Sequence, residues 1–169
     1  KSAGVRRFVF ASSCSNYGAA GDQVQDEHGE LHPVTAYATS KVRVEGDLAQ
    51  LADDDFSPVI MRNATAYGVS PRIRFDIVLN NLTAWAYTTG HVLLKSDGTP
   101  WRPIVHIADI SMAVLAALES PREVVHNQVF NVGADVAFTV NHLARIVSAA
   151  MDAPLKVKHL DPRNEVKIA

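Results

Sequence analysis

The sequence predicts an α/β fold built around a parallel β-sheet. Residues 8–11 form an apolar run of strand length, residues 58–61 form a second, and the segment between them carries apolar residues at helical spacing. Strand, helix, strand in this order is the βαβ pattern, which joins parallel strands. The chain has 169 residues, 47% of them apolar, which is enough material for one modest domain.

The first half of the chain supplies the elements of that unit. Residues 1–4 look like the tail of a helix with Gly4 as its C-cap, and they lead into the strand that contains residues 8–11. A helix is expected to begin near Ala36, because Thr35 is a plausible N-cap. Its apolar residues continue at helical spacing and predict a buried stripe at Val44, Leu48 and Leu51.

The second half continues with alternating elements. Residues 71–90 carry apolar residues at mostly helical spacing, and Gly90 is the expected stop. Asp109 is expected to cap an amphipathic helix that runs through Leu118. The other expected elements are a strand at 58–61, a short strand at 91–95, a turn at 96–98, a strand at 128–132, a helix from Thr139 to about Met151, and a short strand at 155–159.

Composition argues against several classes of function. The 16 Lys and Arg against 18 Asp and Glu give a net charge of −2, so neither nucleic acid nor an anionic membrane is an expected partner. No run approaches the roughly 18 consecutive apolar residues of a membrane span. The 7 His lack the spacing of metal ligands, so no metal site is expected. Cys14 is the only cysteine, which excludes an internal disulfide, and a cytoplasmic location is the default expectation.

The most informative pattern is Tyr37 with Lys41, which follows the Ser12–Ser13 pair at the end of the first strand. A Tyr and a Lys at positions i and i+4 of a helix project from the same face, so the ammonium stands near the phenol and favours its deprotonation. A Ser at the end of a buried strand is suited to hydrogen-bond the same substrate oxygen. The pattern predicts a redox active site. The simpler alternative is a surface helix whose Tyr packs on a Lys stem.

Several segments, in order along the chain, resemble the extended short-chain dehydrogenase/reductase family, in particular its NAD-dependent nucleotide-sugar epimerases and dehydratases. The strand that leads to Gly18 looks like the family's Ser/Thr strand, and Tyr37 with Lys41 matches its Tyr-x-x-x-Lys pair. Residues 61–68 look like a family strand end, at which an Asn commonly stands in place of Thr65. The other similar segments are residues 80–82, 98–109 and 130–133.

The resemblance implies a role for each matched residue. In the family register, counting five back from Gly18, Ser13 is the catalytic serine, beside Tyr37 as base and Lys41 as its partner. The implied cofactor contacts are Tyr37, Lys41, Arg62 and Asn63, and the implied substrate contacts are Ser13, Thr65, Asn81, Leu82 and Arg102. Arg102 would grip the substrate diphosphate, because a guanidinium offers forked donors to phosphate oxygens. For Arg62 a structural salt bridge stays open as the alternative.

The implied activity is that of a nucleotide-sugar 4-epimerase, which transfers hydride to and from bound NAD and acts on a nucleotide-diphosphate sugar. Sugar 4,6-dehydratases carry acidic residues after the Ser or Thr, whereas this chain has Cys14 and Ser15, which disfavours dehydration. Two alternatives remain: an NAD(P)-dependent reductase or dehydrogenase of the same family, and a non-catalytic NAD(P)-binding sensor. The choice between NAD and NADP stays open, because no ribose-reading residue is identified.

The resemblance also implies two parts. Residues 1–68 and 105–135 are expected to form a nucleotide-binding Rossmann part, and residues 69–104 and 136–169 a smaller substrate-binding part, with the active site in the cleft that they form. The family's Gly-rich cofactor turn has no counterpart in the sequence. The chain is therefore expected to hold the C-terminal part of a doubly wound Rossmann-like sheet without its N-terminal half. The full-length protein is expected to be a homodimer that uses the Tyr37 helix.

Overall fold

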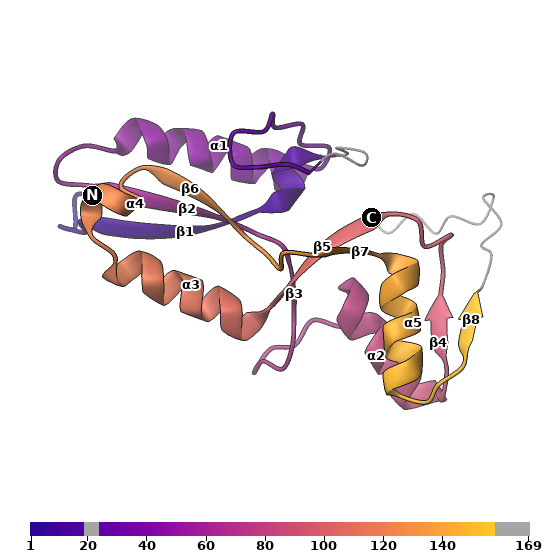
Figure 1. The fold of residues 1–169 in the computed structure, drawn as a ribbon. Helices are drawn as coiled ribbons and strands as arrows, with labels where there is room; N and C mark the ends of the chain where they lie inside the picture. Colours follow the sequence, from indigo (N-terminus) through magenta and orange to yellow (C-terminus); the bar gives the residue numbers. More distant parts are fainter. Residues whose placement is uncertain (19–23, 158–169) are drawn as a thin grey trace. The chain divides into compact units, whose positions relative to one another are not determined.

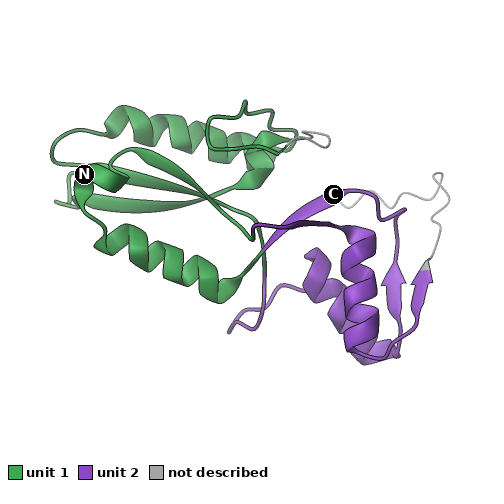
Figure 2. Ribbon diagram, viewed as in Figure 1, with its two compact units in different colours: residues 1–66, 105–134 green, residues 67–104, 135–169 purple. Residues whose placement is uncertain are grey.

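The computed structural model describes residues 1–18 and 24–157, which form two compact units (Figure 2). Unit 1 comprises Lys1–Ala66 and Val105–Ala134. Unit 2 comprises Tyr67–Ile104 and the described residues from Asp135 onward. The end of the strand expected at 155–159 lies outside the described residues.

Unit 1 is a parallel sheet with helices on both faces (Figure 1). The strand order is β1 (Arg7–Ser13), β2 (Ser57–Asn63) and β6 (Gln128–Val132), and both pairings are parallel. The two long helices, α1 (Ala36–Leu51) and α3 (Ile107–Glu119), lie on opposite faces of this sheet. Two short helices complete the unit, the 3₁₀ turn η1 (Cys14–Tyr17) and α4 (Arg122–Val125). The predicted α/β class with a parallel sheet is confirmed.

The apolar core of unit 1 lies between the sheet and α3. Val59 and Met61 of the central strand pack with Ala117 of α3 and Val125 of α4. The central strand is buried along nearly its whole length, as expected for a strand covered on both faces. The α3 side of the sheet is therefore held by ordinary hydrophobic burial.

The helix α1 begins as predicted but buries a different face. Thr35 is its N-cap and accepts a hydrogen bond from the backbone N–H of Ala38 at 3.1 Å. Of the predicted apolar stripe only Leu48 is buried, whereas Val44 is 37% and Leu51 is 48% exposed. That part of the prediction is wrong, because the buried face of α1 carries the carboxylate of Glu45, which finds hydrogen-bonding partners beneath the helix.

Unit 2 is organised around two helices, α2 (Val78–Thr89) and α5 (Val140–Ala150). Beside them, β4 (Val92–Leu94) pairs in parallel with β8 (Leu155–Val157). β7 (Ala137–Thr139) pairs antiparallel with β5 (Trp101–His106), a strand whose last two residues belong to unit 1. The short strand β3 (Thr65–Tyr67), whose first two residues belong to unit 1, neighbours β5 in a sheet of order β3-β5-β7. Side chains of both helices build the core with β4, and Leu143 and Val92 are among its most buried members.

Two predicted helix starts are wrong by a few residues. α2 begins at Val78 rather than near residue 71, because the amide of Asn80 donates at 2.9 Å to the carbonyl of Arg74 and so holds the preceding loop in a non-helical path. α3 begins at Ile107 with His106 as its N-cap, and His106 Nδ1 accepts from the backbone N–H of Ala108 at 3.2 Å. Asp109 lies in the first turn instead, where its charge still favours the helix dipole.

Candidate active site

The end of strand β1 presents Ser13 beside a tight turn. Ser13 is half-buried and is the N-cap of η1, where its Oγ accepts a hydrogen bond from the backbone N–H of Ser15 at 3.2 Å. The Ser15 hydroxyl donates to the same oxygen at 2.8 Å. These contacts fix the Ser13 hydroxyl at the carboxyl end of the sheet, which is the edge at which open α/β folds bind ligands.

The first two turns of α1 bring Tyr37 and Lys41 together, as their spacing predicts. Lys41 Nζ lies 5.5 Å from the centre of the Tyr37 ring and 4.8 Å from that of Phe10. The same ammonium donates a hydrogen bond of 2.8 Å to the carbonyl of Ala11, two residues before Ser13. Lys41 therefore connects the helix that carries Tyr37 to the strand that carries Ser13. Tyr37 is 56% exposed.

Below this pair lies a buried ion pair between Glu45 of α1 and Arg62 of β2. Arg62 Nη2 lies 2.8 Å from Glu45 Oε2, and both side chains are less than a tenth exposed. Arg62 Nη1 donates to the Tyr17 hydroxyl at 2.9 Å and to the Glu27 carbonyl at 3.1 Å. Burial alone lowers the pKa of Arg62, but the hydrogen bonds to Glu45 and Tyr17 outweigh it, so the pKa is raised above the usual value for arginine.

This geometry bears on the predicted cofactor role of Arg62. Most N–H donors of its guanidinium group bind protein acceptors, namely the Glu45 carboxylate, the Tyr17 hydroxyl and the Glu27 carbonyl. Arg62 therefore forms the structural salt bridge that the sequence analysis kept as an alternative to cofactor binding. Asn63, the next residue, differs. Its Oδ1 is buried and accepts no hydrogen bond within the described residues, so this oxygen can accept a hydrogen bond from a ligand.

The other predicted substrate contacts occupy different positions. Thr65 is half-buried at the start of β3. Asn81 of α2 donates from Nδ2 to the Phe75 carbonyl at 2.8 Å, and Leu82 is 3% exposed in the core of unit 2. Arg102 is exposed on β5 and donates from Nη1 to the Trp101 carbonyl at 3.2 Å. The structure thus brings Tyr37 and Lys41 together, whereas Asn81, Leu82 and Arg102 belong to unit 2.

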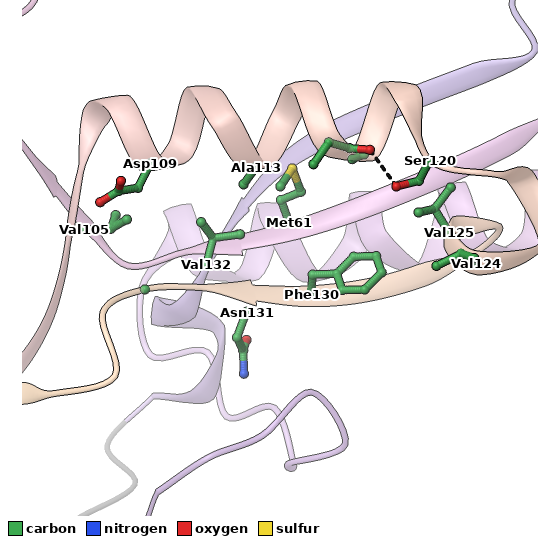
Figure 3. Close-up of a pocket in the computed structure, with 13 residues that line it drawn as sticks. Met61, Val105, Asp109, Ala113, Ser120, Val124, Val125, Phe130, Asn131 and Val132 are labelled. Atoms are coloured by element: carbon green, nitrogen blue, oxygen red, sulfur yellow. Dashed lines mark hydrogen bonds between the residues drawn. The ribbon is translucent and has the colours of Figure 1, made fainter.

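Two cavities lie among the described residues, one in each unit. One of about 430 Å³ lies in unit 1 between α3 and β6, and Figure 3 shows it lined mainly by apolar side chains such as Phe130 and Val132. A second of about 820 Å³ lies in unit 2 along α2. Neither contains a predicted catalytic residue.

Residues 1–18 and 24–157 contain no group of three or more His, Cys, Asp or Glu side chains placed to hold a metal ion. Over the same ranges, no helix has both the length and the apolar character needed to cross a membrane.

Comparison with known proteins gives a consistent picture. A model of the NAD dependent epimerase/dehydratase family matches residues 1–133. The UDP-glucose 4-epimerase of Yersinia pestis is 28% identical over 186 residues, covering 98% of this chain and 54% of that enzyme. The dTDP-D-glucose 4,6-dehydratase of Mus musculus is 26% identical over 144 residues, covering 85% of this chain and 39% of that enzyme.

Among solved structures, MoeE5 in complex with UDP-glucuronic acid and NAD is similar with a TM-score of 0.81 and 28% identity. The match covers 94% of this chain and 53% of MoeE5. The chain spans about half the length of the curated relatives that it matches.

Proposed function

The chain belongs to the NAD dependent epimerase/dehydratase family, and on that basis we propose that the full-length protein is a nucleotide-sugar 4-epimerase that uses NAD. The observation that carries the proposal is the contact of Lys41 with both the Tyr37 ring and the carbonyl of Ala11, two residues before Ser13. It brings together a phenol, an ammonium group and the strand that carries the Ser13 hydroxyl, which in the proposed reaction serve as base, cation and hydrogen-bond donor.

In this proposal Tyr37 is the base. Its phenolate takes the proton of a sugar hydroxyl while the carbon that bears this hydroxyl loses a hydride, so the alcohol becomes a ketone. The ammonium group of Lys41 lies 5.5 Å from the centre of the Tyr37 ring, so a positive charge stands beside the proposed base. Ser13 hydrogen-bonds the same sugar oxygen and steadies it during the proton transfer. Return of the proton from Tyr37 and of the hydride to the opposite face of the sugar gives the epimer, with no net oxidation.

The residues present fit an NAD cofactor. Bound NAD would supply the hydride acceptor and donor. Lys41 has three N–H donors, and one of them is directed at Ala11, which leaves the ammonium able to hold a ribose hydroxyl beside Tyr37. Asn63 offers the buried oxygen that lacks a donor within the described residues. Arg62 is the least supported of the cofactor contacts, because its donors are committed to Glu45, Tyr17 and Glu27.

The substrate is proposed to be a nucleotide-diphosphate sugar. Support comes from relatives named for UDP-glucose and from MoeE5 with UDP-glucuronic acid. Arg102 would bind the diphosphate, with Asn81 and Thr65 as further contacts. Leu82 would contribute through its backbone, because its side chain is buried in the core of unit 2. Dehydration is disfavoured, because Cys14 and Ser15 follow Ser13 and offer no pair of acids to expel water.

The full-length protein is proposed to act as a homodimer that uses α1. Val44 and Leu51 lie seven residues apart on this helix, hence on one face, and both are more than a third exposed. Burying them against a second copy would remove apolar surface from water. Light scattering of the full-length protein tests this, and a monomer at assay concentrations would exclude it.

The product distinguishes the reactions of this family. Full-length protein is incubated with UDP-glucose and with UDP-glucuronic acid, and products are analysed by chromatography and mass spectrometry. A 4-epimerase gives a product of unchanged mass without net change in nicotinamide absorbance. Loss of one water would indicate a dehydratase, and net production or consumption of NADH or NADPH would indicate a dehydrogenase or reductase. Either result would contradict the proposal.

A further inference from the structure

A row of polar side chains crosses the sheet of unit 1 directly beneath the candidate site. Ser12 of β1 is in register with Arg62 of β2, which is in register with Asn131 of β6. Figure 3 shows the Asn131 side chain directed away from α3. The next row toward the carboxyl ends contains Ser13 and Asn63, two of the predicted site residues. The polar row therefore lies one residue before Ser13 and Asn63 along their strands.

Glu45 of α1 connects this polar row to the helix. Its Oε1 accepts from the Ser12 hydroxyl at 2.5 Å and from the Asn16 amide at 2.7 Å, and its Oε2 accepts from Arg62 at 2.8 Å. The Tyr17 hydroxyl closes the far end, because it accepts from Arg62 at 2.9 Å and donates to Asn131 at 2.7 Å. Both oxygens of the buried carboxylate thus have partners.

The position of Glu45 on α1 makes this connection specific for the site. Tyr37, Lys41 and Glu45 follow each other at intervals of four residues, so they form one stripe along the helix. Lys41 holds the Ala11 carbonyl, and Glu45 holds the hydroxyl of Ser12, the next residue. The residue after that is Ser13. Two consecutive turns of α1 therefore form hydrogen bonds to two consecutive residues of β1. These two bonds restrict sliding and rotation of the helix relative to the strand.

We propose that Glu45 is a positioning residue, which through Ser12 and Arg62 holds Tyr37 and Lys41 in register with Ser13. The inference rests on the proposed function, since it assigns those three residues to the proton transfer. A buried ion pair is a weak source of stability, because desolvation offsets much of its attraction. Its directional hydrogen bonds are a strong source of geometry, and proton transfer is sensitive to displacements of about 1 Å.

The test separates positioning from plain stability. Glu45→Gln is made in the full-length protein, with Glu119→Gln as the matched control, because Glu119 is an exposed carboxylate of α3 and lies on another helix than the proposed dimer face. Glutamine keeps the shape of the side chain and one acceptor oxygen, but it removes the negative charge to which Arg62 and Ser12 donate hydrogen bonds. The measurements are kcat per NAD-loaded site, KM for the nucleotide sugar, and the melting temperature. A purely structural role would lower the melting temperature and leave kcat per loaded site unchanged.

Positioning predicts that Glu45→Gln lowers kcat per loaded site roughly 10-fold or more while KM changes less than about threefold. Glu119→Gln stays at the parent values. A Glu45→Gln enzyme with parental kcat, or with a change confined to KM, would overturn the inference. If Glu45→Gln does not fold, Ser12→Ala is the variant that tests the positioning role, because it removes one hydrogen-bond donor to Glu45 and leaves the ion pair with Arg62 in place. It must then lower kcat at unchanged KM, and parental kcat would refute positioning.

A parallel Tyr37→Phe variant distinguishes failure of the proposed function from failure of the positioning role of Glu45. If Tyr37→Phe is inactive and Glu45→Gln is fully active, the proposed function stands and the positioning role fails. If Tyr37→Phe itself is fully active, the proposed function fails first, and the positioning role fails with it.

Discussion

Replacing Arg62 by Met should be among the most destabilising single changes in unit 1. The change removes the charged partner of Glu45, whose side chain is only 7% exposed. The Glu45 carboxylate and the Tyr17 hydroxyl each lose the hydrogen-bond donor that Arg62 supplied. Breaking a buried ion pair from one side costs about 3–5 kcal/mol, because the remaining charge stays desolvated. Methionine keeps much of the side-chain length, so lost packing is a minor contribution.

The control for this prediction is the exposed pair of Arg74 with Asp76, whose side chains are 67% and 65% exposed. Such pairs contribute about 0–1 kcal/mol, since water screens them. Urea denaturation of the full-length protein measures both variants, and Arg62→Met should lower the free energy of unfolding by several times more than Arg74→Met. The double change of Glu45→Leu with Arg62→Met should recover part of the loss, because no charge is then left buried. Equal effects of Arg62→Met and Arg74→Met would refute the reasoning.

The remaining predictions concern the substrate and the pH. Arg102→Ala in the full-length protein should weaken nucleotide-sugar binding by ~1.5–3 kcal/mol, the usual contribution of a charge-assisted contact, and leave bound NAD unchanged; calorimetry that shows equal loss of both ligands would make Arg102 structural. The hydrogen bond from Arg74 holds the pKa of Asp76 below its usual value of 3.8. A depressed carboxyl pKa contributes stability above the unfolded pKa and loses it as the pH falls through the folded one. The difference in unfolding free energy between the parent and Asp76→Asn should therefore be present at pH 7 and be lost as the pH falls below 3.8 and through the lowered pKa; urea melts that give the same difference at neutral and at acidic pH would contradict this.

The elements that the sequence predicted well are those with a strong local signal. The apolar strand before Ser13 is confirmed as β1, and 128–132 as β6. The caps Thr35 and Thr139 are confirmed, because a threonine hydroxyl that accepts from the first helical N–H groups needs only its own neighbours. The proximity of Tyr37 and Lys41 follows likewise from helical spacing alone.

What the sequence missed depends on partners far along the chain. Glu45 appears polar and exposed by any local measure, yet it is buried because Ser12, Asn16 and Arg62 converge on it from other elements. The displaced apolar stripe of α1 has the same cause. The short strand β7 was also missed, because its pairing with β5 joins residues more than 30 positions apart and its three residues carry no periodic signal. One usable clue to Glu45 was available: it follows Tyr37 and Lys41 at the same interval of four.

The most direct test of the central claim is the turnover of Tyr37→Phe in the full-length protein, measured on cofactor-loaded enzyme with Tyr87→Phe as control. Tyr87 is 82% exposed in unit 2 and has no part in the proposed chemistry. The account predicts that Tyr37→Phe lowers kcat by roughly 100-fold or more while binding of the nucleotide sugar is nearly kept, because the variant loses only the hydroxyl that carries the proton. Near-parental turnover of Tyr37→Phe would contradict the account.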